Sequence, residues 1–404
     1  MKYNFDLKCD RSNTNCVKWD AVKDMFGSED VIPMWVADMD FPAAKPIVAA
    51  LKKRAAHEFY GYTKPGPELI EAIVNRMQRK FDWQIRPEWI VFTPGVIPAL
   101  SAAVRAVSRP GDEIILQQPV YFPFFSVVTQ NGCKIVNNAL KFDGKRYTMD
   151  FKDLENKFRP AAGSHMAHSR VKAIIYCNPQ NPIGRLWTEA ETTRMGEIVI
   201  RNGGVVISDE IHCEILYKGY RHTPFAAISD EFAQNSVVCM APSKTFNLAG
   251  LHASCIIIPN QKLRDSFSDA MAAVVPGPNV FGLVAMEAAF RDGDDWLAQM
   301  LDYLNGNLKI TMEFFANRIP KIKVIKPQGT YLLWLDCRRL GLDNQALSRF
   351  MREQARVGFD DGFMFGESGS GFERMNIACP RSILNEALAR IEKAVNSLYD
   401  GRMR

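Results

Sequence analysis

The chain has 404 residues, 47% of them hydrophobic, and its 50 basic and 45 acidic residues give a net charge of +5 at pH 7. This composition is typical of a globular protein with a large core, and the length suits two domains. The basic residues are spread along the chain without a basic block, so no nucleic-acid partner is expected. The most apolar long stretch, 270–290, is broken by prolines and glycines, so no membrane association is expected.

The N-terminus and the cysteines favour a cytoplasmic location. The first ten residues, MKYNFDLKCD, contain no apolar run, so no signal peptide is expected. The nine cysteines are scattered, without a C-x-x-C pair, which favours reduced thiols in the core over disulfides or a zinc site. His165 and His168 lie in a small-residue segment without a neighbouring carboxylate, and they are interpreted as loop residues rather than metal ligands.

The first part of the chain contains two features that bear on a binding site. Residues 1–45 include VIPMWVADMDFP, show little regular pattern and are expected to return to a second domain. The segment TPGVIPAL, residues 93–100, predicts a glycine turn that opens a helix. The free N–H groups at the start of such a helix suit an anion.

The middle of the chain alternates short apolar runs with helical patterns. The apolar runs are EIILQ (113–117), VKAIIYC (171–177), GVVISDE (204–210), SVVCM (236–240) and ASCIII (253–258). Continuous apolar runs bounded by turn residues are typical of strands that are covered on both faces. The helical segments include residues 188–204, which open at a threonine and close at glycines. This alternation predicts an α/β fold with a mainly parallel sheet.

The pattern changes after about residue 290. A long amphipathic helix is predicted over about 295–318, followed by the strands KIKVI and TYLLWLD. A helix over 344–356, the run RMNIAC and a final helix over 382–398 complete the chain. This order predicts a smaller α+β domain. We therefore expect a large domain over 46–288 and a small domain made of 1–45 and 289–404.

Polar side chains follow the predicted strands at the point where each strand ends. They are Tyr121, Asn178 and Asn181, Asp209 and His212, and Ser243 and Lys244. Ligands of open α/β sheets bind outside the carboxyl ends of the strands, so these side chains are expected to converge with the helix start near Gly95. Asn178 is interpreted as a turn residue rather than a ligand.

This set of residues fits pyridoxal phosphate. The amine of Lys244 would form a Schiff base with the cofactor aldehyde, and the carboxylate of Asp209 would keep the pyridine nitrogen protonated. An amide suits the ring hydroxyl, and an aromatic side chain suits the face of the ring. The phosphate would bind at the helix start, formed by Gly95, Val96 and Ile97, and at the hydroxyl of Ser243. Lysine is rarely buried without a partner, and burial lowers the pKa of an amine.

At these residues the chain resembles the fold-type I pyridoxal-phosphate enzymes of the aminotransferase superfamily, and more closely the MalY/PatB-type cystathionine β-lyases. The resemblance covers essentially the whole chain. It is carried by CVKWD, WVADMDF, FYGYT, NPQNPIGRLW, SDEIHCEI, SKTFNLAGL and RMNIACPRS. The occurrence of several of these motifs in one chain is highly specific.

The resemblance implies a role for each site residue. By this resemblance, Lys244 is the Schiff-base lysine, Asp209 pairs with the pyridine nitrogen and Asn181 reaches the ring hydroxyl. Tyr121 stacks on the ring, and Tyr62 reaches the phosphate of the neighbouring subunit. Arg374 binds the substrate α-carboxylate, and the backbone near Ala37 closes over the substrate. A homodimer with shared active sites is thereby expected. His212 is either a ring contact or a structural histidine, and Arg374 taken alone is also consistent with a salt-bridge partner. His252 departs from the pattern, since many superfamily members carry a basic or amide phosphate ligand there.

Three functions remain open from the residues alone. A C–S β-lyase would cleave a small sulfur amino acid to pyruvate, ammonia and a thiol. An aminotransferase would use the same lysine to return the proton to the cofactor. A protein that retains the cofactor for its fold would act by binding a regulatory partner. The complete catalytic set disfavours the third function, and the resemblance to the lyases favours the first over the second.

Overall fold

The structure is a computed structural model, and it describes residues 1–159, 170–272 and 274–400. His165 and His168 lie outside the described residues. Among the described residues, no helix is long and apolar enough to cross a membrane. Seven of the nine cysteines are buried, as expected of core residues, and all nine are free thiols.

A seven-stranded sheet forms the centre of the larger layer, in the order β2-β10-β9-β8-β7-β3-β4. Its strands are β2 (Ile90–Thr93), β3 (Glu113–Leu116), β4 (Lys134–Asn137), β7 (Val171–Cys177), β8 (Val205–Asp209), β9 (Ser236–Met240) and β10 (Ser254–Ile257). Five neighbouring strands, β4, β3, β7, β8 and β9, run parallel, and β10 is antiparallel to both of its neighbours. The predicted mainly parallel sheet is therefore confirmed.

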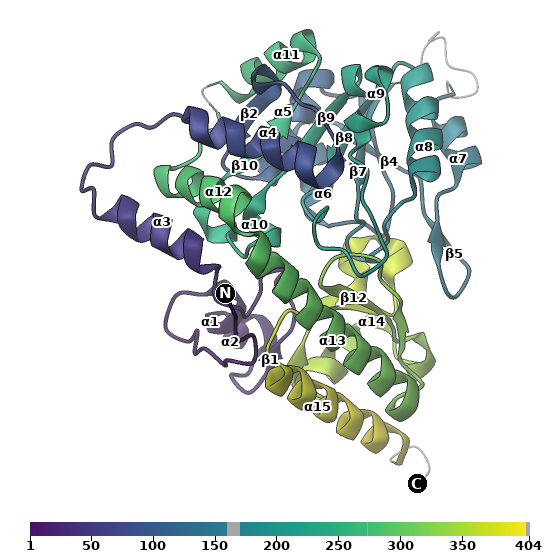
Figure 1. Cartoon of the computed structure of the whole chain (residues 1–404). Helices are drawn as coiled ribbons and strands as arrows, with labels where there is room; N and C mark the ends of the chain where they lie inside the picture. Colours follow the sequence, from purple (N-terminus) through teal and green to yellow (C-terminus); the bar gives the residue numbers. More distant parts are fainter. Residues whose placement is uncertain (160–169, 273, 401–404) are drawn as a thin grey trace.

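Helices cover both faces of this sheet (Figure 1), which explains why its strands read as continuous apolar runs. Helices α5 (Val96–Val107), α6 (Pro123–Gln130) and α11 (Gln261–Met271) pack on one face. Helices α7 (Phe151–Lys157), α8 (Glu189–Arg201), α4 (Pro67–Phe81) and α12 (Val280–Asp292) pack on the other. In β3, Ile114 and Leu116 belong to the first core and Ile115 to the second. The predicted threonine, Thr188, is the N-cap residue of helix α8 and forms a capping box with Glu191.

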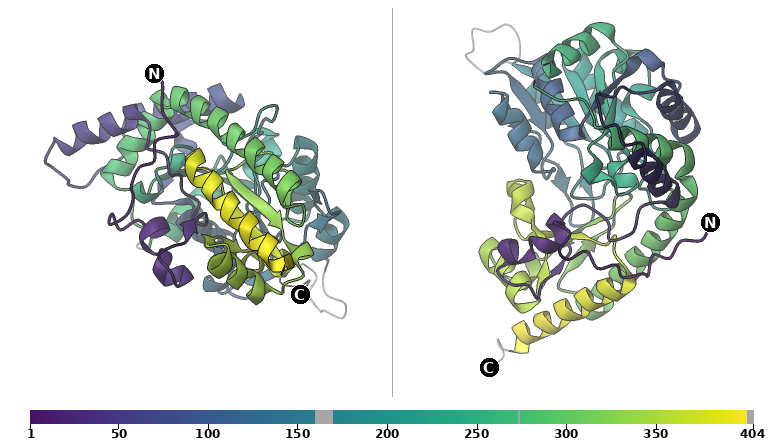
Figure 2. Two further views of the ribbon diagram at one scale, coloured as in Figure 1. Left: turned by 90° about the horizontal axis from the view of Figure 1, so that it is seen from below. Right: turned by 90° about the vertical axis from the view of Figure 1, so that its left-hand side faces the viewer.

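A four-stranded antiparallel sheet forms the smaller layer, in the order β11-β12-β15-β14. Its strands are β11 (Lys323–Ile325), β12 (Leu332–Asp336), β14 (Asp360–Asp361) and β15 (Phe372–Asn376). Two long helices, α13 (Asp294–Arg318) and α15 (Arg381–Asp400), lie side by side against it (Figure 2). The predicted single helix over 344–356 is divided into α14 (Asn344–Arg349) and a π-helical turn (Phe350–Gln354), because the Ala355 N–H bonds to the Phe350 carbonyl five residues back.

The N-terminal segment returns to this smaller layer, as expected. Strand β1 (Ile32–Pro33) pairs in parallel with β13 (Val357–Gly358), and the short helices α1 (Val17–Asp20) and α2 (Val22–Phe26) precede it. The remaining α-helices and strands of the described residues are α3 (Lys45–Ala55), α9 (Asp230–Gln234), the one-turn helix α10 (Pro242–Thr245) and the hairpin β5 (Lys141–Phe142) with β6 (Tyr147–Thr148). The predicted large domain, 46–288, contains the seven-stranded sheet, and the predicted small domain, 1–45 with 289–404, contains the four-stranded sheet. These domain boundaries stay a prediction.

Candidate active site

Lys244 stands where β9 ends. The chain leaves this strand through α10, a single turn that opens with Pro242, and Lys244 lies in this turn just beyond the carboxyl end of the strand. Lys244 Nζ donates a hydrogen bond of 2.7 Å to the backbone oxygen of Ala37, which belongs to the N-terminal segment. Burial, and to a smaller extent the positive charge of Arg374, lower the pKa of the Lys244 amine to about 8.

A cavity of about 640 Å³ lies at this edge of the sheet. Most of the residues predicted to hold the cofactor line it: Gly95, Val96, Ile97, Tyr121, Asn181, Asp209, His212, Ser243 and Lys244. Ala37 and His252 also line it. Two predicted residues, Arg374 and Tyr62, do not. The edge where the parallel strands end therefore brings together an amine, a carboxylate, an amide, an aromatic ring and a helix start, as expected.

The helix start is held in place by the last residue of β2. Thr93 Oγ1 donates to the Gly95 carbonyl at 3.0 Å and also contacts Ser254 Oγ at 2.6 Å, so β2 and β10 together fix the turn. Helix α5 begins directly after Gly95. Its first N–H groups have no partner within the helix, which suits a phosphate in the cavity.

Asp209 is a buried carboxyl at the end of β8. Its Oδ1 accepts a hydrogen bond of 3.1 Å from the Ile211 N–H. Burial raises the pKa of Asp209 to about 7, and the neighbouring charge of Glu210 adds to the rise. A cationic ring nitrogen placed beside this carboxyl would stabilise its ionised form, so the site favours a ligand with a protonated heteroaromatic nitrogen.

His212 presents a neutral imidazole. The side chain is buried, and its Nδ1 has no hydrogen-bond partner among the described residues. Burial, and to a smaller extent the positive charges of Lys244 and Arg374, lower the pKa of His212 to about 3. The ring packs edge-on against Tyr331 at 6.0 Å. A buried nitrogen without a partner calls for a hydrogen-bonding ligand, so His212 fits a polar cofactor in the cavity better than a closed structural role.

Arg374 lies behind Asn181 rather than on the cavity surface. Its Nη1 donates to Asn181 Oδ1 at 2.9 Å, and its other terminal nitrogen forms a buried ion pair with Asp360 and contacts the Trp35 carbonyl at 3.3 Å. The Arg374 Nε has no partner among the described residues. Arg374 is therefore a desolvated, preoriented guanidinium one residue from the cavity.

Sequence reasoning missed the side chains that hold the segment around Ala37. Asn376 of β15 donates to the Val36 and Asp38 carbonyls at 2.7 and 2.6 Å. Asn247, three residues after Lys244, donates to the Met39 and Phe41 carbonyls and accepts from the Met39 N–H. Both asparagines lie in motifs that carry the resemblance, and the motifs themselves were the signal that more residues there serve the site.

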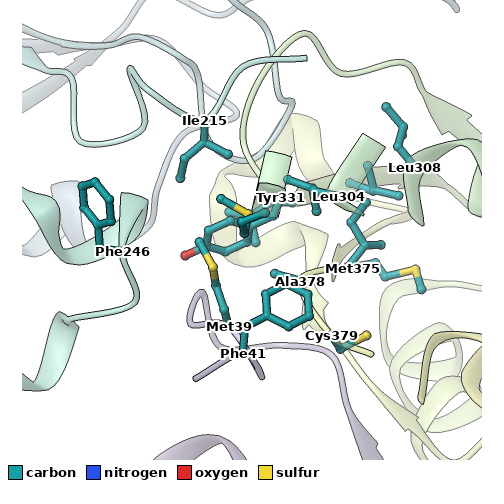
Figure 3. Packing of buried hydrophobic residues seen from close by; sticks show 14 of the residues in the cluster. Met39, Phe41, Ile215, Phe246, Leu304, Leu308, Tyr331, Met375, Ala378 and Cys379 are labelled. Carbon is teal, nitrogen blue, oxygen red and sulfur yellow. The ribbon is translucent and has the colours of Figure 1, made fainter. Parts of the chain in front are cut away.

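The Ala37 carbonyl has a second donor. Tyr331 of the smaller layer donates from its hydroxyl to this oxygen at 2.9 Å. Met39 and Phe41, which follow in the segment, pack beside Tyr331 and Ala378 (Figure 3). Contacts from the smaller layer thus hold the N-terminal segment next to Lys244.

A buried charge cluster anchors the same segment from its other side. Asp40 accepts hydrogen bonds from Lys18 Nζ at 2.7 Å, Trp19 Nε1 at 2.8 Å and Arg11 at 2.7 Å. Lys18 is only 1% exposed. Burial alone would raise the pKa of Asp40, but the Lys18 and Arg11 charges and the three donors hold it below its usual value. The motifs CVKWD and WVADMDF are therefore joined by an ion pair.

Tyr62 is fully exposed and lies away from the cavity. It belongs to the segment that follows α3 and extends away from the body of the chain (Figure 1). Arg54 of α3 donates to the carbonyls of His57 and Phe59 and so fixes the start of this segment. The reach of Tyr62 into a neighbouring subunit stays a prediction.

The fold and the cavity have counterparts among known proteins. The model of the family described as aminotransferase class I and II matches residues 29–391, so the chain belongs to this family. The fold-type I architecture expected from the sequence is thereby confirmed, with its mainly parallel sheet between helices.

Three relatives cover nearly all of the chain. Cystathionine beta-lyase PatB of Bacillus subtilis (strain 168) is 41% identical over 97% of this chain and 100% of that protein. The solved structure of a PLP-bound putative aminotransferase from Clostridium difficile 630 is 42% identical, covers 98% of this chain and 100% of its own, and has a TM-score of 0.93. The PLP-bound C-S lyase from Staphylococcus hominis is 31% identical, covers 98% of each chain and has a TM-score of 0.90.

The lowered pKa of Lys244 has a measurable consequence. Amines react with acylating reagents as the free base, so in protein stripped of cofactor the Lys244 reactivity should rise with a midpoint near pH 8, instead of the usual 10.5. Mass spectrometry of the labelled peptides measures this directly, with the exposed Lys52 as the internal reference. A Lys244 profile that runs parallel to that of Lys52 would contradict the cavity electrostatics described above.

Proposed function

We propose that this chain is a pyridoxal-phosphate-dependent C–S β-lyase. It takes an L-cysteine thioether, with cystathionine as the first candidate, and one water molecule to pyruvate, ammonia and a free thiol. One observation carries the proposal: Lys244, Asp209, Asn181 and Tyr121 line one cavity in a chain 41% identical to a protein named cystathionine beta-lyase over nearly its full length.

The residues present suit pyridoxal phosphate, the cofactor of the related structures. Lys244 would hold it covalently, Asp209 would pair with its ring nitrogen, and Asn181 would reach its ring hydroxyl. Tyr121 would lie against the ring, while Ser243, His212 and the α5 start at Gly95, Val96 and Ile97 would complete the cradle. Bound there, the cofactor supplies a protonated conjugated ring that accepts the electron pair left when Cα loses its proton.

The chain itself contributes the base, the clamp and the dry surroundings. Lys244 Nζ, with a pKa near 8, is matched to removing a proton from Cα at neutral pH. The Ala37 carbonyl, which accepts from Lys244 Nζ, holds the amine in place until it acts. Arg374 would bind the substrate carboxylate after exchanging its hydrogen bond to Asn181 for one to the substrate, because a guanidinium binds a carboxylate through two parallel hydrogen bonds.

Aminotransfer is the second candidate function, and it shares the first proton abstraction. The related Clostridium difficile structure, named a putative aminotransferase, keeps this candidate open. Two of the three relatives carry lyase names, and this favours elimination. A thiolate on Cβ leaves without a dedicated acid, so the cavity needs no residue beyond those described. The complete catalytic set leaves a purely regulatory role without support.

Elimination is tested by incubating the holoenzyme with L-cystathionine and no keto acid. We expect thiol and pyruvate to be released in a one-to-one ratio over many turnovers, because elimination regenerates the starting enzyme. The Lys244→Ala variant is the matched control and should release neither. Turnover that stops after one equivalent and resumes only when a keto acid is added would make the chain an aminotransferase.

We further propose that the active unit is a cytoplasmic homodimer. The nine free thiols support a reducing compartment. The exposed aromatic residues Phe59, Tyr60 and Tyr62 support a subunit contact, because exposed aromatic side chains gathered on one segment are typical of protein interfaces. In this dimer Tyr62 of each subunit would complete the phosphate site of the other.

Shared sites predict complementation between two inactive variants. Lys244→Ala and Tyr62→Ala proteins, mixed under conditions that exchange subunits, should form hybrids in which one site has both residues intact. Random exchange should restore about a quarter of the wild-type activity, because half of the dimers are hybrids with one working site each. Each variant carried alone through the same exchange is the control, and a mixture no more active than these controls would place Tyr62 outside the neighbouring site.

A further inference from the structure

A second cavity, of about 290 Å³, lies beside β14 and β15. It shares no lining residue with the cavity around Lys244. Much of its wall is apolar, with Phe26, Trp35, Met351 and Phe359 among the lining side chains. Three carboxyl groups also line it: Asp360, Asp361 and Glu373. The cavity is thus both apolar and acidic.

Glu373 is the unusual member of this wall. The residue is 1% exposed, and neither carboxyl oxygen has a hydrogen-bond partner among the described residues. Burial raises the pKa of Glu373 well above its usual value, and the charges of Asp361 and Asp360 raise it further. A buried carboxyl without a partner is costly, and a native protein that retains one normally supplies a ligand, an ion or water for it.

The two arginines near the cavity form their ion pairs with carboxylates other than Glu373. Arg374 pairs with Asp360. Arg352 lines the cavity, forms a 3.5 Å ion pair with Glu353 and acts electrostatically on Asp361. Asp361 also accepts from Ser348 Oγ at 3.1 Å. Glu373 is the carboxyl of this cavity for which the described residues supply neither a cation nor a donor.

We infer that this cavity binds a small organic ammonium compound, with its charged nitrogen at Glu373 and Asp361 and its hydrocarbon part against the aromatic wall. A cation would supply the missing partner of the Glu373 carboxyl. The aromatic side chains of Phe26, Trp35 and Phe359 provide apolar surface and π faces for the carbon atoms next to the nitrogen. A metal ion fits less well, because no three His, Cys, Asp or Glu side chains of the described residues, these three carboxyls included, are placed so that they could hold a metal ion together.

Binding carries a proton signature. Burial and the charges of Asp361 and Asp360 raise the pKa of Glu373, and an ammonium group beside the carboxyl would lower this pKa again. Entry of the ammonium group therefore favours breaking of the Glu373 O–H bond, with the proton passing to the buffer. The bound nitrogen remains charged throughout. The cavity adjoins Arg374 through Asp360, but binding does not depend on the role proposed for Arg374.

The test is isothermal calorimetry of the holoenzyme with N,N-dimethylbenzylamine in two buffers of different ionisation enthalpy. A tertiary amine cannot form an imine with the cofactor, so the cofactor aldehyde does not capture it. We expect saturable one-to-one binding accompanied by release of protons to the buffer. Glu373→Gln, which mimics the protonated side chain in shape, should weaken binding at least about tenfold and abolish the proton release.

Matched variants distinguish binding at Glu373 from nonspecific association of the amine with acidic or apolar surface. Glu367→Gln, an exposed carboxylate that does not line the cavity, should bind like the wild type. Asp361→Asn provides a second variant with the same expected weakening if Glu373→Gln fails to fold. Absence of saturable binding, unchanged affinity in both cavity variants, or equal binding of neutral benzyl alcohol would overturn the inference.

Discussion

The hydrogen bond from Lys244 Nζ to the Ala37 carbonyl is the contact on which the rest of the site depends. It joins an amine at the end of the central sheet to a segment more than two hundred residues earlier in the chain. Tyr331 and Asn376 of the smaller layer donate hydrogen bonds to the same segment. Asp40, which belongs to this segment, forms a buried ion pair with Lys18. Lys244 of the larger layer and Tyr331 of the smaller one thus both donate to the Ala37 oxygen, and Ala37 lines the cavity.

Charge balance explains why these groups are tolerated in the interior. Burial shifts the pKa values of Lys244, Asp209 and His212 toward the neutral form of each group, to about 8, 7 and 3. The protein thereby avoids much of the cost of isolated buried ions. The cationic ring nitrogen of a bound cofactor would lower the pKa of Asp209 and so favour its ionised form. The anionic phosphate would accept hydrogen bonds from the free N–H groups at the start of α5. The charges of the site and the charges of the cofactor are therefore complementary.

Much of this could be predicted from the sequence, because the central strands are covered on both faces and end in polar residues. The apolar runs predicted β7, β8 and β9, and the polar residues at or just beyond their ends predicted Asn181, Asp209 and Lys244 as site residues. The clamps on the Ala37 segment could not be predicted, since Asn247 and Asn376 act through contacts between distant parts of the chain. The position of Arg374 behind Asn181 likewise depends on how the two sheets meet.

The most direct measurement of the central claim is the steady-state kinetics of Asp209→Asn with L-cystathionine. The substitution keeps the shape of the side chain and removes the carboxylate that would hold the ring nitrogen protonated. The account predicts a fall in kcat of at least about 100-fold, with cofactor still bound as judged by its absorbance. A variant that retains cofactor and turns over at the wild-type rate would contradict it.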